Sequence, residues 1–438
     1  MVSKLNSPEI LHFLIIVTLV LVSARFLGEV FRKFNQPAVI GEILAGIILG
    51  PSLIGTYFPG FFDAIFLVQP KAYSAFDGLS NVGIIILMFV AGLEVELGKI
   101  RKYGKHAASI SLAGLIFPFA IGFFTVWFFY GYLFNNPTDN KLIPAMFFGT
   151  ALSITALSVC AKILMDLNIL KTKIGMLTLT AAMIDDFFGW ILFSIILQLM
   201  NKEGEGGFGS VLMILLFVAV LMTAGKWAIN KILEFSEKHL KQPGGSITVG
   251  ILLCFIGAVF TEYLGIRGVF GAFLMGVVVG DSKYFKEKYQ DILHQFIVNI
   301  FAPLFFASIG LRINFIENFH LGVVAFILLV ACIAKLVGAG VGARIGGLKA
   351  NESMAVAFGM NARGSMEIVL GLLALQAKII DERIFVGLVV MTMVTILIAG
   401  PMMKFFLQRH HTIHGEEVIT KKVIASPHPA IAENDLTL

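Results

Sequence analysis

The segment GEILAGIILG, residues 41–50, and the segment GAFLMGVVVG, residues 271–280, carry glycine at the same three positions with aliphatic residues between them. Two further pairs of similar segments follow these in the same order along the chain. They are LMFVAGLEVEL from Leu87 with LFFASIGLRINF from Leu304, and FGTALSITALSV from Phe148 with FGMNARGSMEIV from Phe358. The chain therefore contains two related halves, and its fold should be built from an internal repeat.

The composition places this repeat in a lipid bilayer. Of the 438 residues, 58% are hydrophobic and only 14% are charged, whereas soluble domains carry roughly 25% charged residues. The basic residues are spread over short loops, so no patch for nucleic acid is expected. Cys160, Cys254 and Cys332 lie in apolar runs without metal-ligand spacing, and we interpret them as small core residues. We expect an all-α integral membrane protein with no cofactor.

Hydropathy predicts thirteen membrane-spanning helices, because a run of about 18 to 25 apolar residues suffices for one crossing. If the N-terminus lies outside, the cytoplasmic loops carry most of the Lys and Arg, as the positive-inside rule requires, and the C-terminus lies inside. Residues 1–405 should then form the membrane domain and residues 406–438 a short disordered tail. The predicted spans are 9–30, 38–55, 78–97, 107–131, 143–164, 174–200, 209–232, 245–263, 268–281, 296–311, 320–343, 353–377 and 384–403.

The two halves are predicted to cross the bilayer in opposite directions, since the span at 38–55 runs from inside to outside and the span at 268–281 runs back. Such inverted repeats are typical of secondary transporters, whose sites lie near mid-bilayer. The segment ALSITALS, residues 151–158, is rich in hydroxyl and β-branched residues, and GMNARGSM, residues 359–366, contains two glycines and an asparagine. Both disfavour a continuous helix. Interruptions at matched positions predict crossed broken helices and an ion site.

The segment AAMIDDFFGW, residues 181–190, places Asp185 and Asp186 in the middle of an apolar span. Adjacent side chains on a helix point about 100° apart, so one carboxylate can pair with the equally deep Lys335 while the other faces a cavity. Burial favours the neutral form of each group and pairing favours the charged form. This site should exchange protons against a bound ion. A pair that only fixes helix packing would leave the second aspartate unexplained.

Hydroxyl and carbonyl oxygens of the first interrupted segment should complete the ion site. Carboxylate, hydroxyl and carbonyl oxygens suit a small dehydrated alkali cation, and Ser153 and Thr155 are the candidate helpers. In the second interrupted segment, Arg363 and Glu367 are four residues apart on one helix face and should pair with each other. Their charges could offset the dipoles of the broken helix ends.

Five stretches together resemble the cation:proton antiporter superfamily, in the branch that holds bacterial sodium/proton antiporters, glutathione-gated potassium efflux systems and plant cation/proton exchangers. The resemblance covers residues 9–405. It implies a homodimer in which each thirteen-helix protomer has a dimerisation subdomain and a core subdomain, the core including about 78–200 and 296–377. The stretches are GEILAGIILGPSLIG, SVCAKILMDLNILKTKIGMLTLTAAMIDDFFGW, APLFFASIGL, NARGSMEIVLG and the GPMM ending.

The resemblance also implies an activity and its residues. Members with paired aspartates are typically electrogenic sodium/proton antiporters of the bacterial inner membrane. By the same resemblance, Asp186 is the main carrier of the cation and the proton, Asp185 pairs with Lys335, and Arg363, Glu367 and Asn361 support the crossing helices. No enzymatic activity is expected, and the transported alkali cation, Na⁺ or alternatively Li⁺ or K⁺, is the only metal expected.

Other functions remain as alternatives. An intramembrane aspartyl protease needs two carboxylates from separate helices, which an adjacent pair on one helix cannot supply. A channel, or a sodium-coupled carrier of organic solutes, predicts a roomy polar cavity and little need for Lys335. A K⁺/H⁺ antiporter would use the same oxygens as a Na⁺/H⁺ antiporter. The histidines of RHHTIH, His410, His411 and His414, are expected in a solvated tail, with pH sensing or metal binding as the alternative.

Overall fold

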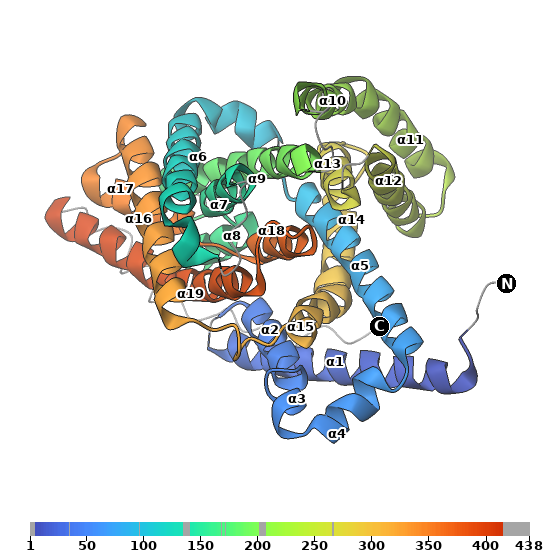
Figure 1. The fold of residues 1–438 in the computed structure, drawn as a ribbon. Coiled ribbons are helices and arrows are strands. Elements are labelled where there is room, and N and C mark those ends of the chain that lie inside the picture. The colour runs from blue at the N-terminus through green and yellow to red at the C-terminus, as the bar shows by residue number, and fades with distance from the viewer. Residues whose placement is uncertain are drawn as a thin grey trace, which may run out of the picture.

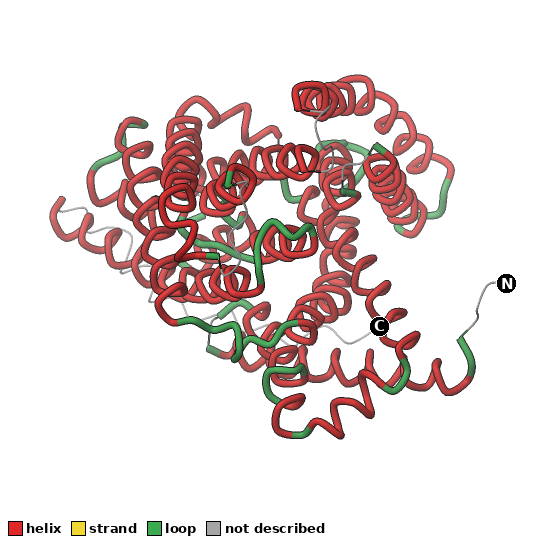
Figure 2. The backbone as a smooth tube through the Cα atoms, in the orientation of Figure 1, coloured by secondary structure: helices red, strands yellow, loops and turns green. Residues whose placement is uncertain are grey.

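The computed structural model describes residues 5–34, 36–95, 97–134, 141–167, 169–170, 172–200, 207–264 and 267–414. All regular structure in these residues is helical (Figures 1 and 2). Figure 1 shows α10, α11 and α12 at one side of the molecule and α16 and α17 at the opposite side, with α1 to α4 along a third side. The all-α prediction is therefore confirmed for the described residues.

The helices follow one another with short connections. Three π-helical stretches, Asp63–Leu67, Leu221–Gly225 and Ile297–Phe301, continue directly into neighbouring helices. The α-helices are α1 (Ser7–Lys33), α2 (Ala38–Leu49), α3 (Ile54–Tyr57), α4 (Pro59–Phe62), α5 (Pro70–Leu93), α6 (Leu97–Leu133), α7 (Leu142–Ser153), α8 (Leu157–Asp166), α9 (Lys173–Met200), α10 (Gly207–Val220), α11 (Lys226–His239), α12 (Gly244–Tyr263), α13 (Gly268–Gly280), α14 (Glu287–Phe296), α15 (Ala302–Arg312), α16 (Leu321–Ile345), α17 (Ala350–Met360), α18 (Ser365–Gln376) and α19 (Glu382–His414).

Ten helical segments among the described residues are long and apolar enough to cross a membrane, and each coincides with one of the thirteen predicted spans. The other three predictions, 143–164, 268–281 and 353–377, fall on shorter helices. Large apolar side chains on the outside, such as Phe128 at 73% exposure and Val259 at 68%, would be unfavourable in water. The chain is a multi-pass integral membrane protein.

Helical structure stops in the middle of both segments whose composition predicted an interruption (Figure 2). Between α7 and α8 the backbone is extended at Ile154, and between α17 and α18 it is extended at Gly364. The two interruptions touch, because the Ala156 N–H donates to the Ala362 carbonyl at 3.0 Å. Glycine is required at residue 364, since a Cβ there would lie 2.6 Å from the Ala156 Cβ.

Glycines bring the backbones of two helix pairs into direct contact. A Cβ at Gly46 of α2 would lie 2.0 Å from the Ala307 carbonyl oxygen of α15. In the other half, a Cβ at Gly276 of α13 would lie 2.1 Å from the Phe89 carbonyl oxygen of α5. Gly46 and Gly276 are the middle glycines of the repeated segments at 41–50 and 271–280, so the repeat specifies close packing of α2 on α15 and of α13 on α5.

The last helix is longer than the sequence suggested. Helix α19 extends beyond residue 405, the predicted end of the membrane domain, and continues to His414. Just past that predicted end, the Phe406 ring stacks on Phe358 with centroids 5.5 Å apart. Residues 415–438, and the side chains of residues 409–414 with the three histidines, lie outside the described part.

Candidate ion-binding site

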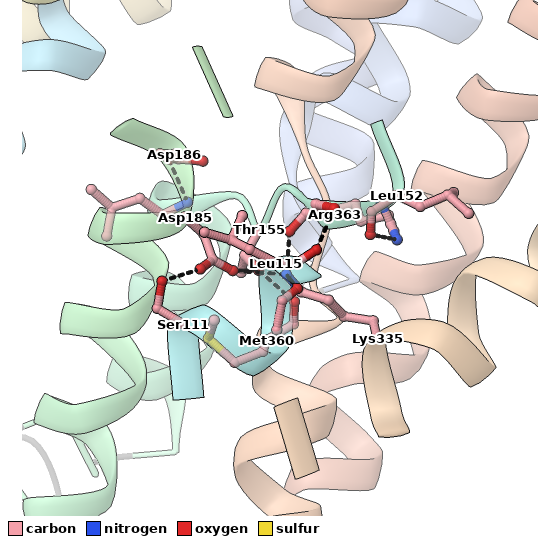
Figure 3. Close-up of polar contacts among 12 residues, drawn as sticks. Ser111, Leu115, Leu152, Thr155, Asp185, Asp186, Lys335, Met360 and Arg363 are labelled. Atoms are coloured by element: carbon pink, nitrogen blue, oxygen red, sulfur yellow. Dashed lines mark hydrogen bonds and ion pairs between the residues drawn. The ribbon is translucent and has the colours of Figure 1, made fainter. Parts of the chain in front are cut away.

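Asp185 of α9 and Lys335 of α16 form a buried ion pair (Figure 3). The Lys335 Nζ atom lies 2.7 Å from Asp185 Oδ2, and both side chains are fully buried. The predicted pairing of an aspartate with Lys335 is thus present, and Asp185 is the member that makes it. A charge pair removed from water in this way is stable only when further hydrogen bonds satisfy both groups.

Hydroxyl groups from two other elements supply those hydrogen bonds to Asp185. Ser111 of α6 donates to Asp185 Oδ1 at 2.7 Å. Thr155, in the interruption after α7, has its Oγ1 atom 3.1 Å from Asp185 Oδ2 and 2.8 Å from the Met360 carbonyl oxygen. Since the paired carboxylate is surrounded by three donors, its position is fixed by α6, α16 and the broken segment together.

The carboxyl end of α7 is covered by cationic side chains. The Arg363 guanidinium donates to the Ala151 and Leu152 carbonyls, each at 2.8 Å, while Lys335 donates to the Ser153 carbonyl. A helix interrupted inside a protein leaves its last carbonyls without partners and its negative dipole end uncompensated. Arg363 also pairs with Glu367 at 2.9 Å. Both the predicted Arg363–Glu367 pair and the predicted compensation of a broken helix end are present.

Asp186 has a different environment from its neighbour. Its Oδ2 atom accepts a hydrogen bond from the Leu157 N–H at the first residue of α8, at 3.3 Å. Its Oδ1 atom has no hydrogen-bond partner, and among the described residues no cationic side chain lies within ion-pair distance of the carboxylate. The amino end of a helix favours negative charge. Asp186 is therefore a buried carboxylate that a helix terminus stabilises and that has one oxygen without a hydrogen-bond partner.

A cavity of about 330 Å³ reaches Asp186. Its walls come from α1, α2, α5, α8, α9, α14, α15 and α18, so the cavity lies where the α1, α2, α5 and α15 assembly meets the helices around the interruptions. Glu42, Glu94, Lys162 and His294 line it together with Asp186. An ion or a proton can thus approach Asp186 from one side of the molecule.

Ser153 and Asn361 were also predicted residues, Ser153 as a helper at the ion site and Asn361 as a support of the crossing helices. The Ser153 hydroxyl lies 2.7 Å from the Gly149 carbonyl and 2.9 Å from the Leu115 carbonyl, so this residue reaches Lys335 through its backbone carbonyl only. Asn361 ends α17, and its Nδ2 atom lies 3.5 Å from the Cys332 sulfur. Cys160 and Cys254 are buried as expected, and Cys332 is half-buried.

The sequence interpretation missed three contributors: the Ser111 hydroxyl, the Leu157 amide and the Gly114 carbonyl, which accepts from Lys335 at 2.9 Å. The last two are backbone groups, and the side chain of a residue does not indicate what its backbone amide or carbonyl will bind. Ser111 is one of several serines in apolar runs, and only the packing of α6 on α9 distinguishes it. The predicted interruption could have indicated the Leu157 amide, since α8 must begin shortly after the interruption.

This fold and this site define a class of protein, a membrane transporter with charged groups at the junction of interrupted helices. In solved structures, the sodium proton antiporter MjNhaP1 from Methanocaldococcus jannaschii has the same overall fold, with a TM-score of 0.58 at 17% sequence identity. The match covers 90% of this chain and 96% of that protein. Residues 15–409 match the family model described as sodium/hydrogen exchanger, transmembrane. The chain belongs to this family of monovalent cation/proton antiporters, which are transporters and not enzymes.

Relatives agree with this assignment, two of them over nearly their whole length. The Na⁺/H⁺ antiporter NhaS4 of Synechocystis is 32% identical over 407 residues, covering 91% of this chain and 98% of the relative. The Na⁺/H⁺-K⁺ antiporter GerN of Bacillus cereus is 28% identical, and the match covers 90% of this chain and 96% of the relative. Cation/H⁺ antiporter 17 of Arabidopsis thaliana is 30% identical over 88% of this chain, which spans 47% of that longer protein.

Proposed function

We propose that this protein is an electrogenic Na⁺/H⁺ antiporter in which Asp186 carries the cation and the proton alternately. The observation that carries the proposal is the contrast between the two aspartates. Asp185 is engaged by Lys335, Ser111 and Thr155, whereas Asp186 lines a cavity and has one oxygen without a hydrogen-bond partner. A dehydrated alkali cation or a proton can occupy that oxygen, and the two ligands exclude each other.

Competition for one carboxylate converts binding into exchange. A bare carboxylate is unfavourable in an apolar interior, while a protonated or cation-loaded one is neutral. The protein can then change between inward-open and outward-open states only when Asp186 is loaded. The Leu157 amide and the positive end of α8 stabilise the brief ionised state during ligand exchange.

The second proton of an electrogenic cycle is assigned to the Asp185–Lys335 pair, because Asp185 is the residue next to Asp186 and Lys335 pairs with it. A cation that also contacts Asp185 would weaken the ammonium–carboxylate pair and allow a proton to leave Lys335. Two protons exchanged for one Na⁺ move one net charge, which is worth about 2.3 kcal/mol per 100 mV of membrane potential. The potential could then drive cation export.

We further propose that thirteen crossings form an inverted repeat. The packing of α2 on α15 and of α13 on α5 supports this, since α2 corresponds to α13 and α5 to α15, so the same contact between opposite halves occurs twice. The predicted core ranges include α5 and α15, but these two helices pack on α13 and α2, which lie outside those ranges. This packing favours a smaller moving core that consists of α6 to α9 and α16 to α19. The protein would act as a homodimer in a bacterial inner membrane, with the N-terminus outside and the C-terminus inside.

The cavity would then open to the cytoplasm, because Arg32, Lys162 and His294 line it near helix ends that the positive-inside rule places there. A K⁺/H⁺ antiporter is the main alternative, since the same oxygens bind both ions and the GerN relative is named for both. A sodium-coupled carrier of organic solutes is less favoured, because Lys335 has three buried partners and the cavity, at about 330 Å³, is near the lower limit for small-molecule pockets.

Proteoliposomes with a preset pH gradient and an internal pH dye test the proposal. Addition of Na⁺ should dissipate the gradient for wild type and for the control Asp166→Asn, whose carboxylate is exposed, but not for Asp186→Asn. Parallel additions of K⁺ and Li⁺ rank the three ions by transport activity. An imposed membrane potential should accelerate exchange when it has one sign and retard exchange when it has the other. A gradient that ignores all three cations, or full activity of Asp186→Asn, would contradict the proposal.

A further inference from the structure

The cavity that leads to Asp186 contains a second buried carboxylate, Glu42 of α2. The residue is 3% exposed and lines the cavity wall. Among the described residues, no side chain lies within ion-pair distance of its carboxylate and no hydrogen bond reaches it. The charged form of a carboxyl group in this position is unfavourable unless a cation compensates it, and without a cation the group takes up a proton.

Nearby cations are engaged elsewhere. On α1, the side chains of Arg25 and Arg32 both bind Glu29, at 2.9 Å and 2.7 Å. Two other basic residues that line the cavity face different carboxylates: Lys162 lies 3.8 Å from Asp166, and His294 lies 3.4 Å from Glu94. Of the three acidic residues that line this cavity, Glu42 and Asp186 are thus left without a cationic side chain, while Glu94 has one.

The repeat shows that helix packing does not require this carboxylate. Glu42 occupies the second position of GEILAGIILG, and the corresponding position of GAFLMGVVVG is Ala272, which is fully buried. The adjacent Gly41 and Gly271 have the same role in both copies, since a Cβ at either would clash with the backbone of a neighbouring helix. The glutamate is therefore an addition to a packing motif that functions with alanine.

We propose that Glu42 is a second, low-affinity site for the transported monovalent cation, which occupies it before reaching Asp186. The proposal rests on the assigned antiport at Asp186 and extends it to the access cavity. A hydrated or partly hydrated cation at Glu42 compensates the buried charge, and a carboxylate in a low-dielectric cavity concentrates counter-ions near the carrier site. The affinity at Glu42 must stay low, since the ion has to move on.

Binding measurements can isolate this site from transport. The probe is radioactive Na⁺ bound to purified full-length protein in detergent at alkaline pH and low ionic strength. The variant Asp186→Asn, without the carrier carboxylate, should retain weak saturable Na⁺ binding, and the double variant with Glu42→Gln should lose it. If Asp186→Asn binds no Na⁺, or if Glu42→Gln leaves its residual binding unchanged, Glu42 is not a cation site.

Transport by the single variants gives an independent test. Glu42→Gln should raise the KM for Na⁺ roughly tenfold, the lower end of the concentrating effect of a charged cleft, with little change in maximal rate. Glu42→Asp should restore the KM. The matched control Glu94→Gln removes a carboxylate that has a histidine partner and is 32% exposed. Because solvent already screens the charge of this carboxylate, the KM should change little.

These outcomes separate the two proposals. Wild-type exchange that disappears in Asp186→Asn, together with an unchanged KM in Glu42→Gln, refutes the Glu42 site and leaves the antiport intact. An equal rise in KM for Glu42→Gln and Glu94→Gln also refutes a specific site, since it would reflect only the general charge of the cavity. If Asp186→Asn exchanges ions normally, the antiport assignment itself fails.

Discussion

Replacement of Lys335 by methionine tests how much the central ion pair contributes to stability. The change keeps a long unbranched side chain but removes the donor to Asp185, to the Ser153 carbonyl and to the Gly114 carbonyl. Removal of one partner from a buried pair costs about 3 to 5 kcal/mol. Asp185 keeps its contacts with the Ser111 and Thr155 hydroxyls, so we expect the lower end of this range.

The magnitude can be measured as a shift in melting temperature. An unfolding entropy of about 2.1 cal/mol/K per residue gives about 1 °C per kcal/mol for a chain of 438 residues. Purified Lys335→Met in detergent should therefore melt roughly 3 °C below wild type. The control Lys238→Met removes a lysine from an exposed ion pair on α11 and should show no resolvable shift.

A double-mutant cycle decides whether the pair itself is responsible. The variant Asp185→Asn/Lys335→Met leaves no buried charge at this position, so its destabilisation should be smaller than the sum of the single effects by at least about 1 kcal/mol. Additive single effects, or a Lys335→Met protein as stable as wild type, would show that the link between α9 and α16 through this pair does not stabilise the protein and would refute this reasoning.

Further perturbations test the elements that surround the pair. Ser111→Ala removes one of two hydroxyl contacts of the paired carboxylate and should lower stability by about 1 to 3 kcal/mol, measured by the same melting assay. Arg363→Gln leaves Glu367 without its cationic partner and α7 without its carbonyl cap, and should lower stability by about 3 to 5 kcal/mol, with partial recovery in Arg363→Lys. Gly46→Ala forces a Cβ against α15 and should reduce the yield of monodisperse protein, whereas Gly60→Ala, with open space around it, should not.

Sequence alone predicted the features that depend on composition and local spacing. Ten predicted spans coincide with long helices because apolar runs report directly on the bilayer. Both interruptions were predictable from hydroxyl residues, glycine and asparagine inside apolar segments. The Arg363–Glu367 pair follows from a spacing of four residues on one helix face. Lys335 was predicted to pair with an aspartate because equally deep opposite charges must compensate each other.

Other features depended on tertiary packing and could not be predicted. Ser111 reaches Asp185 only because α6 packs on α9. The Ser153 hydroxyl was expected at the ion site, but serine on a helix readily bonds to the carbonyl four residues earlier, here Gly149. The continuation of α19 beyond residue 405 depends on the contact between Phe406 and Phe358 on α17, which no local pattern shows.

Proton release upon cation binding tests the central claim most directly. Purified protein in weakly buffered detergent solution with a pH dye is titrated with Na⁺, and the released protons are counted per protomer. Competition at Asp186 predicts that Na⁺ releases protons from wild type, that release disappears at high pH where the site is already ionised, and that Asp186→Asn loses the proton of that carboxyl group. Na⁺ binding without proton release in wild type, or undiminished release from Asp186→Asn, would contradict exchange at this carboxylate.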